Sequence, residues 1–378
     1  MYKPDAADRL ARSGAITAGE QAMIGVGLIG ARWGASAHVP AIQASPDFRL
    51  AAVATSRMET ATVAAREFGA PAAYDDPFAL ASDPAVDVVV VCVRVPEHQR
   101  LVDAALKAGK HVYCEWPLAR DVAEAEAMVA AAKAAGVVNL VGLQSRVVPA
   151  LMQLKALVGG GAIGKVISAS LEISGVWPIA VPADIEYLQK AESGGNWFTI
   201  AGGHAIDVFC DILGPFASLS ASAATRYPEV TIVDEGRTTA RTAPDAFAVS
   251  GVLEGGAFAS FVVRGSPASG FGLRFEVSGE TGGLLITAPG PNPMIQMSDL
   301  TLSQVGTDGT LTPLAIPPEC TLADPAVGWH AIGVAQTYAR LAAAINNGAP
   351  VPADFAAGLA NHRLLERVMR SAREGLRV

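Results

Sequence analysis

The sequence predicts two domains: an α/β domain with a doubly wound parallel sheet, then an α+β domain with a large, mostly antiparallel, open-faced sheet. A chain of 378 residues is long enough for two domains with sizeable cores. Apolar strands alternate with helical stretches at first, which is typical of a parallel sheet. Longer segments of alternating apolar and polar residues follow, which favours antiparallel strands. We therefore expect a flexible leader at 1–22, the α/β domain at 23–147 and the α+β domain at 148–378.

The α/β domain is predicted from five apolar segments separated by helical ones. The expected strands are MIGVGLI, FRLAAVAT, VDVVVVCV, HVYCEW and VNLVGLQ. Unbroken valine runs favour strands that are covered on both faces. The expected helices include PEHQRLVDAALKAG and DVAEAEAMVAAAKAAG, which end at Gly109 and Gly136.

The α+β domain is predicted from long alternating segments that are joined by turn signals. The expected strands lie in GKVISASLEISGVW, ASLSASAATR, AFAVSGVLEGGAFASFVVRG, LRFEVSGETGGLLITA and MSDLTLSQVG. Two helices are expected to close the chain, WHAIGVAQTYARLAAAINNG and ADFAAGLANHRLLERVMRSAREG.

Composition limits the classes of partner and of compartment. Hydrophobic residues make up 51% and charged residues 17% of the chain, which is typical of a soluble globular protein. The net charge of −8 and the lack of a Lys/Arg run argue against nucleic acid. No apolar run has membrane-spanning length, and residues 1–22 do not resemble a secretory signal. We therefore expect a cytoplasmic protein that binds neither nucleic acid nor a membrane.

The cysteines and histidines do not indicate a metal site or a disulfide framework. Cys92, Cys114, Cys210 and Cys320 lie far apart and form no C-x-x-C pair, so we expect reduced thiols. The six histidines form neither an H-x-x-x-H nor an H-x-E-x-H grouping, so we expect no metal.

A glycine-rich segment after the first expected strand predicts a dinucleotide-binding Rossmann domain. A literal G-x-G-x-x-G lies at Gly25, Gly27 and Gly30, and the phosphate turn could begin at Gly25 or at Gly30. A strand of this kind needs five or six residues, which favours Gly30. The helix after this turn would then begin near Ala35 and offer free backbone N–H groups to a pyrophosphate.

The residues beside this turn indicate which cofactor the domain takes. Arg32 could contact the phosphates, and Trp33 could cover them or the ribose, although Trp33 could equally pack under the helix. The second strand ends at Thr55, Ser56 and Arg57, with no carboxylate at its tip. An arginine with hydroxyls suits a 2′-phosphate, so the sequence favours NADP over NAD, with a solvated Arg57 as the alternative.

Polar residues at two further strand ends are candidates for ligand contacts. Arg94, Val95 and His98 follow the third of the quoted strands, where ligands gather in open α/β sheets. Gln144 and Arg146 follow the fifth, and either could reach the cofactor or the substrate. For His98 an ordinary place in a helix is an equal alternative.

The segment AGKHVYCEWPLARDVAEAEAMVAAAKAAGV resembles the Gfo/Idh/MocA oxidoreductase family. Supporting matches are VPEHQRLVDAALKAGK, GLQSRVVPALMQLK, GAIGKV, GGHAIDVF and VSGETGGL. The resemblance implies a Rossmann domain followed by an open-faced sheet domain, with the nicotinamide at their junction. It also implies sugar or cyclitol substrates and a sheet face that is often used for oligomerisation, so we expect a homodimer or homotetramer.

Three departures from the family pattern weaken the inference to catalysis. Trp116 stands where the family has the lysine of its E-K-P motif. Ile200 stands where many members have an Asp, four residues before the catalytic His, and Arg32 replaces a fingerprint glycine. The combination is closer to a divergent branch that includes a yeast galactose-pathway regulator, which acts as a nucleotide-binding switch.

The retained histidine could still move a proton. The resemblance identifies His204 as the acid/base, and an imidazole suits that role because its ordinary pKa lies near neutrality. On a helix, Asp207 would share its face and could orient it, although both residues could instead be structural. Trp116 cannot transfer a proton, but it could stack on a sugar ring or on the nicotinamide. The resemblance implies that Glu115 accepts a hydrogen bond from the nicotinamide ribose.

A long segment at 175–198, rich in Trp, Pro and Gly, is a candidate substrate lid because it precedes the helix of His204. Four of its residues could stack on or bond to a sugar, of which we expect about half to do so: Trp177, Tyr187, Asn196 and Trp197.

These observations favour an NAD(P)-dependent oxidoreductase that acts on a sugar, a glycoside or a polyol. The departures leave a second hypothesis open, a catalytically silent NAD(P)-binding sensor or partner-binding protein. A third is non-redox chemistry on the same scaffold, such as hydrolysis or elimination.

Overall fold

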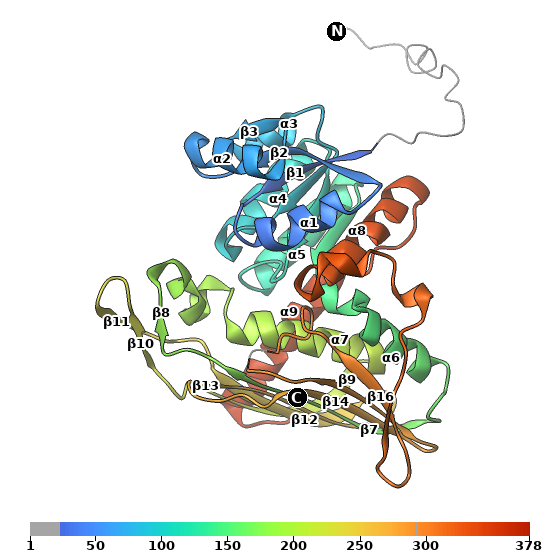
Figure 1. Ribbon diagram of the computed structural model, residues 1–378. Helices are drawn as coiled ribbons and strands as arrows, with labels where there is room; N and C mark the ends of the chain where they lie inside the picture. Colours follow the sequence, from blue (N-terminus) through green and yellow to red (C-terminus); the bar gives the residue numbers. More distant parts are fainter. Residues whose placement is uncertain (1–22, 292) are drawn as a thin grey trace.

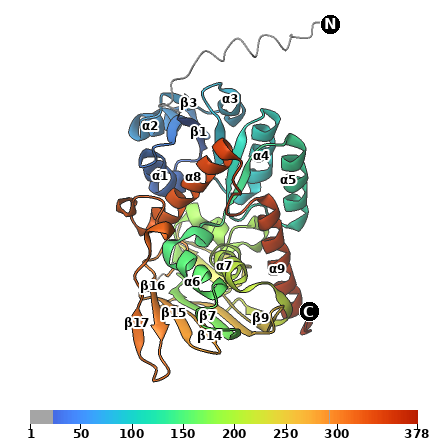
Figure 2. The ribbon, with the colours of Figure 1, turned by 90° about the vertical axis from the view of Figure 1, so that its right-hand side faces the viewer.

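A computed structural model describes residues 23–291 and 293–378, and it shows two domains stacked along one axis (Figure 1). The expected leader at 1–22 lies outside the described residues. The parallel-sheet domain and the larger, mostly antiparallel sheet lie at opposite ends, with helices between them (Figure 2). In the described part of the chain, no helix is long and apolar enough to cross a membrane. The four cysteines are free thiols.

The first domain is built on a six-stranded parallel sheet in the order β3-β2-β1-β4-β5-β6. The strands are β1 (Ile24–Ile29), β2 (Phe48–Ala54), β3 (Ala72–Tyr74), β4 (Val88–Val91), β5 (His111–Glu115) and β6 (Asn139–Gly142). The helices are α1 (Val39–Gln43), α2 (Met58–Phe68), α3 (Pro77–Ser82), α4 (His98–Lys107) and α5 (Val122–Ala135). The four valines of β4 are fully buried, as a strand covered on both faces requires. This strand order confirms the predicted Rossmann architecture.

The second domain is built on an eight-stranded sheet in the order β17-β16-β15-β14-β7-β13-β12-β9. Its strands are β7 (Val166–Val176), β9 (Phe216–Ala224), β12 (Ala246–Leu253), β13 (Phe258–Ser266), β14 (Gly272–Gly279), β15 (Gly283–Ala288), β16 (Thr301–Val305) and β17 (Leu311–Pro313). All neighbours pair antiparallel except β13 and β7, which confirms the predicted, mostly antiparallel sheet. A small second sheet contains β8 (Ala180–Val181), β10 (Glu229–Ile232) and β11 (Arg237–Ala240).

Three helices cover one face of the large sheet: α6 (Pro149–Gly159), α7 (Gly203–Leu213) and α9 (Phe355–Glu374). The ring of Phe209 on α7 lies 5.4 Å from Phe275 and 6.1 Å from Phe261, measured between centroids. This aromatic packing fixes α7, and with it the histidine in its first turn, against the sheet. No described helix covers the opposite face (Figure 1).

The helix α8 (Trp329–Asn347) comes late in the chain but packs against the first domain. Its Val334, Tyr338 and Leu341 are buried in the same hydrophobic cluster as Val26 and Tyr113. The helix α8, which follows the large sheet in the chain, therefore completes the core of the first domain. Packed side chains of α8, as well as the chain connection after β6, hold the two domains together.

Candidate active site

The turn after β1 begins at Gly30, where the strand-length rule predicts it. Gly25 and Gly27 lie inside β1, and a helical segment follows from Gly34. Gly30 has φ +107°, and a Cβ there would lie 2.1 Å from the carbonyl oxygen of Cys92. Only glycine fits this position, because a side chain would clash and the backbone is in a region that other residues avoid.

A cleft of about 850 Å³ runs from this turn along the carboxyl ends of the strands. The residues predicted for the cofactor that line it are Gly30, Arg32, Trp33, Thr55, Ser56 and Arg94, and the predicted lid residue Tyr187 lines it too. Arg57 is exposed and does not line the cleft, whereas Asp75 does. The turn, the helix that follows and the hydroxyls suit an extended dinucleotide, so the residues present fit the cofactor that the fold implies.

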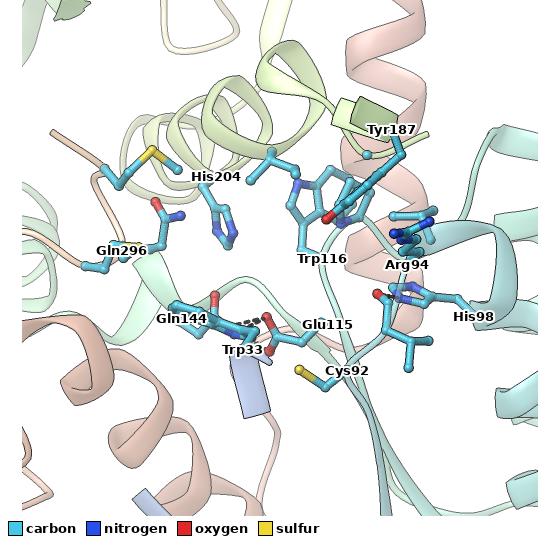
Figure 3. Close-up of a pocket in the computed structure, with 17 residues that line it drawn as sticks. Trp33, Cys92, Arg94, His98, Glu115, Trp116, Gln144, Tyr187, His204 and Gln296 are labelled. Atoms are coloured by element: carbon cyan, nitrogen blue, oxygen red, sulfur yellow. Dashed lines mark hydrogen bonds between the residues drawn. The ribbon is translucent and has the colours of Figure 1, made fainter. Parts of the chain in front are cut away.

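A second pocket, of about 270 Å³, continues the cleft to the junction of the domains (Figure 3). The two hollows share the lining residues Trp33, Cys92, Val93, Arg94 and Tyr187. The first domain contributes Val95, His98, Glu115, Trp116, Pro117 and Gln144, and the second contributes Gly195, Ile200, His204, Met294, Gln296 and Met297. The junction pocket therefore has one wall from each domain.

Glu115, at the end of β5, is the centre of a buried polar network. Its carboxylate accepts hydrogen bonds from Trp33 Nε1 at 3.1 Å and from Gln144 Nε2 at 2.9 Å. His38 Nε2 lies 3.1 Å from the same group, and His38 Nδ1 lies 3.0 Å from the hydroxyl of Tyr338 on α8. Burial alone would raise the pKa of Glu115, but the hydrogen bond and charge of His38 lower it below its ordinary value. The carboxylate is therefore ionised and fully paired.

His98 is a structural part of the pocket wall. Its Nε2 lies 3.1 Å from the carbonyl oxygen of Val93, and its Nδ1 lies 3.3 Å from that of Leu118. Burial lowers the pKa of this imidazole. A neutral imidazole has one N–H, so the distances fit Nε2 donating to Val93 and Nδ1 accepting from the thiol of Cys114, which lies 3.3 Å away. His98 therefore supports the strand ends and offers the ligand only its ring.

Trp116 presents its ring to the pocket while its N–H is already used. The indole Nε1 donates to the carbonyl oxygen of Thr199 at 2.7 Å, and the ring lies 4.6 Å from that of His362. The indole can thus pack against a ligand ring but has no donor left for it.

His204 lies in the first turn of α7 and is 3% exposed. Its Nδ1 is buried and has no hydrogen-bond partner among the described residues. Burial lowers the pKa of His204 to about 4, and the charge of Glu115 only partly opposes this. The imidazole is therefore neutral at neutral pH.

Asp207 does not orient His204, because its carboxylate is occupied by Arg146. Arg146 donates to both oxygens, through Nε at 2.8 Å and through a terminal nitrogen at 2.7 Å. The structure thus places Arg146, which the sequence suggested as a substrate contact, in an ion pair outside this pocket. Arg146 lines a separate hollow between α6, α7 and α8.

Of the four lid candidates, only Tyr187 lines the pocket. Trp177 and Trp197 pack on each other, with ring centroids 4.6 Å apart, and Asn196 accepts a bond from the backbone N–H of Thr199. Packing and local capping therefore explain these three residues, where the sequence suggested ligand contacts.

The segment around Tyr187 crosses the cofactor cleft. Asp184 forms an ion pair with Arg32 of the phosphate loop at 2.6 Å, and its carbonyl oxygen accepts a hydrogen bond from Arg94. The guanidinium of Arg94 also lies 4.8 Å from the centre of the Tyr187 ring. The predicted lid therefore contacts both walls of the cleft.

Several residues of the site were not predicted from the sequence, among them His38, Met294, Gln296 and Met297. His38 had only the weak signal of a histidine within an apolar helical stretch. Met294, Gln296 and Met297 come from the segment between β15 and β16, which carries no motif. The side-chain oxygen of Gln296 is buried and has no partner among the described residues. No cluster of His, Cys, Asp and Glu in the described part of the chain could hold a metal ion.

Comparisons with known proteins cover both domains. Residues 21–143 match the family model GFO_IDH_MocA, described as an oxidoreductase family with an NAD-binding Rossmann fold. Residues 149–288 match the model of the C-terminal domain of Gal80p.

The individual relatives include dehydrogenases and regulators. The dehydrogenase aclE of Aspergillus oryzae is 29% identical over 87% of this chain and 88% of its own. The galactose/lactose metabolism regulatory protein GAL80 of Saccharomyces cerevisiae is 28% identical over 80% and 75%. A solved levoglucosan dehydrogenase in complex with NADH and levoglucosan is 24% identical, with a TM-score of 0.80 over 94% of this chain and 99% of that one. At this identity the solved structure supports the fold alone.

Proposed function

Because the chain joins a nucleotide-binding domain of the Gfo/Idh/MocA oxidoreductase family to a Gal80p-like C-terminal domain, we propose that it is an NAD(P)-dependent oxidoreductase. It would transfer a hydride between the cofactor and a CH–OH group of a sugar, glycoside or polyol-like molecule, with His204 as the acid/base. One observation carries the proposal: a neutral, unpaired imidazole faces a pocket that continues the cofactor cleft.

The proposed reaction assigns a separate role to each side chain. When bound, the nicotinamide supplies the hydride acceptor. His204 takes the hydroxyl proton as the C–H bond breaks and returns it in the reverse direction. Glu115 and Gln144 position the nicotinamide side, and the ring of Trp116 packs against the reactants and excludes water. No lysine is needed in this scheme, since the imidazole receives the proton directly.

The test compares His204→Ala with the exposed control His330→Ala. Each protein would be incubated with NADP+ or NAD+ and a panel of cyclic and linear alcohols, and nicotinamide absorbance would be followed. We expect His204→Ala to lose about 10²- to 10⁴-fold in kcat, as is usual for a general acid/base, while its cofactor Kd changes by less than a few-fold. Equal turnover by His204→Ala and the control would disprove the proposed role.

We propose NADP(H) as the preferred cofactor. Thr55 and Ser56 line the cleft, and Arg57 precedes α2 immediately after them. The test is the ratio of NADP+ to NAD+ affinity in Arg57→Ala, with Arg66→Ala on the same helix as the control. We expect the ratio to fall about tenfold, the usual value of one charged contact. An unchanged affinity ratio in Arg57→Ala would contradict the proposed contact between Arg57 and the 2′-phosphate. Asp75, which also lines the cleft, would then be the residue that decides between the two cofactors, and NAD would be the better assignment.

A catalytically silent sensor is the second candidate, supported by the match of residues 149–288 to Gal80p and by Trp116 in place of a lysine. It predicts tight cofactor binding without turnover of any alcohol in the panel. The two candidates separate in one experiment, because both require NAD(P) binding and only the oxidoreductase requires hydride transfer.

We also propose that the bare face of the eight-stranded sheet joins two or four copies of the chain. Phe258 is 69% exposed on this face and has serines as neighbours. Light scattering after size exclusion would measure the mass, and Phe258→Asp should shift it toward the monomer.

A further inference from the structure

Trp116 belongs to the first domain but makes its hydrogen bond to the second. The indole Nε1 donates to the carbonyl oxygen of Thr199 at 2.7 Å. Thr199 lies in a π-helical turn, Phe198–Gly202, that runs directly into α7, and turns of this kind are frequent at functional sites. The bond therefore crosses the domain junction and ends in the turn before His204. The indole and the imidazole both line the pocket (Figure 3).

The backbone next to His204 lies directly against the indole. A Cβ at Gly203 would lie 2.5 Å from Nε1 of Trp116 and 2.9 Å from two of its ring carbons. Gly203 has ordinary helical angles, φ −63° and ψ −46°, so this close approach and not the backbone conformation explains the glycine. A side chain at position 203 would force the indole or the first turn of α7 to move.

The helix α9 contacts the same two groups. The ring of His362 lies 4.6 Å from that of Trp116, measured between centroids, and its Nε2 accepts a hydrogen bond from the backbone N–H of Ala119 at 3.3 Å. Burial lowers the pKa of His362 to about 4, so the ring is neutral and can accept this bond at neutral pH. The neighbouring Asn361 donates through Nδ2 to the carbonyl oxygen of Gly203 at 3.1 Å. Two adjacent residues of α9 therefore secure the indole and the first turn of α7.

His204 has few other contacts that could fix its direction. Its Nδ1 has no hydrogen-bond partner among the described residues, and the carboxylate of Asp207 is occupied by Arg146. The direction of the imidazole therefore depends on the position of the backbone that carries it. A displacement of about 1 Å at a reacting group can lower a rate about 10²-fold.

We propose that Trp116 is a positioning residue for His204. Together with Asn361 and His362 it forms a clamp, defined by these three side chains, that fixes the first turn of α7 against the first domain. Where it concerns turnover, the clamp rests on the proposed function, because it explains how the acid/base of that reaction is held. Trp116 stands where the family pattern has a lysine, so in this chain the position supplies geometry in place of a charge.

The first test exchanges volume between Gly203 and Trp116, with the best alcohol of the panel as substrate. Gly203→Ala adds a methyl group against the indole, and we expect kcat to fall about 10²-fold while KM and the cofactor Kd change by less than about threefold. Trp116→Leu alone should lower kcat about tenfold. In the double variant the smaller side chain makes room for the methyl group, so kcat should recover about tenfold from the value of Gly203→Ala.

The matched control for this exchange is Gly159→Ala. Gly159 is a helical glycine of α6, and a methyl group added there would meet no atom within 4 Å. We expect this variant to keep the wild-type kcat, both alone and combined with Trp116→Leu, where it should give no recovery.

The second test uses Asn361, which is not among the residues that line the pocket. Asn361→Leu keeps the volume of the side chain and removes the bond to the Gly203 carbonyl. We expect kcat to fall about tenfold with KM unchanged, which a lost ligand contact would not produce. NMR of labelled histidine, assigned with His204→Gln, should show the pKa of His204 rising by about 1 or more, because a looser turn admits water. The exposed Glu366→Ala on the same helix should change neither.

The outcomes separate the clamp from the proposed function. If the losses in kcat multiply in the double variant, or if Asn361→Leu keeps the wild-type kcat and the wild-type pKa of His204, the clamp is overturned and the oxidoreductase stands. If the wild type binds NAD(P) but oxidises no alcohol, the oxidoreductase is overturned. The pKa of His204 in Asn361→Leu then decides the clamp by itself.

Discussion

The two halves of the candidate active site differ in how completely their polar groups are paired. On the nucleotide side, Glu115 contacts three side chains, and the nitrogens of His98 contact two backbone carbonyls. On the substrate side, His204 and Gln296 keep unpaired atoms among apolar neighbours. Both halves are buried to a similar degree, so solvent access does not explain the contrast.

The difference shows which half is complete before a ligand arrives. A network in which most polar atoms are satisfied, the side-chain oxygen of Gln144 being the exception, is rigid and contributes to stability. Such rigidity would suit the nicotinamide cofactor of the proposed function. Buried groups without partners cost stability, and a ligand that supplies the missing bonds recovers this cost. Under the proposed function, the unpaired half is where substrate specificity would reside.

The largest expected effect on stability comes from removing the Glu115 carboxylate, the shared acceptor of the nucleotide side. Glu115→Ala leaves His38, the Trp33 N–H and the Gln144 amide without their shared acceptor. We expect the free energy of unfolding to fall by about 3–5 kcal/mol, as when one partner of a buried pair is removed. Denaturant unfolding measures it, with the exposed Glu97→Ala as the control. A loss below about 1 kcal/mol would mean that this carboxylate does not organise the nucleotide side.

The next effect is the loss of stability on acidification that we expect from the buried His204 on the substrate side. His204 has a pKa of about 4 when folded, and the ordinary value for histidine is 6.5. A lowered pKa means that the unfolded chain binds the proton more tightly. The contribution of the neutral His204 side chain to the free energy of unfolding is therefore complete above pH 6.5 and is lost as pH falls toward 4. At pH 5 we expect a loss of about 2 kcal/mol from this group relative to pH 7.

Unfolding at pH 7 and pH 5 checks this effect in the wild type and in His204→Gln. The difference between the two pH values should shrink in the variant. It should remain in His330→Ala, where the replaced side chain is exposed. Identical pH dependence in all three proteins would contradict a buried, neutral His204.

A smaller effect, of opposite sign, is expected at Gln296. Gln296→Met removes a buried oxygen that has no partner and keeps the shape of the side chain. We expect the free energy of unfolding to stay the same or rise by up to about 1–2 kcal/mol, the cost of an unsatisfied group. A clear loss of stability in thermal or denaturant unfolding would mean that Gln296 is paired, and the contrast between the halves would disappear.

The smallest effect is expected at the ion pair that joins the lid to the phosphate loop. Arg32 and Asp184 are both well exposed, so Asp184→Asn should cost less than about 1 kcal/mol in unfolding free energy. A loss of several kcal/mol would show that this pair, rather than the packing of α8, holds the two sides of the cleft together.

The sequence predicted the elements whose signals are local or periodic. The valine run of β4 and the length of β1 identify the parallel sheet and place the turn at Gly30. Glu115, Trp116 and His204 line the pocket because their motifs have fixed places on the fold. These residues could be selected without knowledge of any contact across the domain junction.

The remaining residues depend on contacts that are distant in sequence. Gln296 lies in a segment without periodicity, and Arg146 is paired with Asp207, 61 positions away. His38 is recognisable only once Glu115 and Tyr338 are known to flank it, at separations of 77 and 300 residues. No pattern within a short window of sequence records such pairings.

The return of α8 to the first domain has a consequence for the order in which the protein matures. During synthesis the first domain emerges early, and domains generally fold as they emerge. Here Tyr338 contributes the hydroxyl beside His38, and its helix closes the cluster around Val26. The nucleotide side therefore cannot reach its final arrangement until about residue 347 has left the ribosome, about 200 residues after the last strand of the parallel sheet has been made.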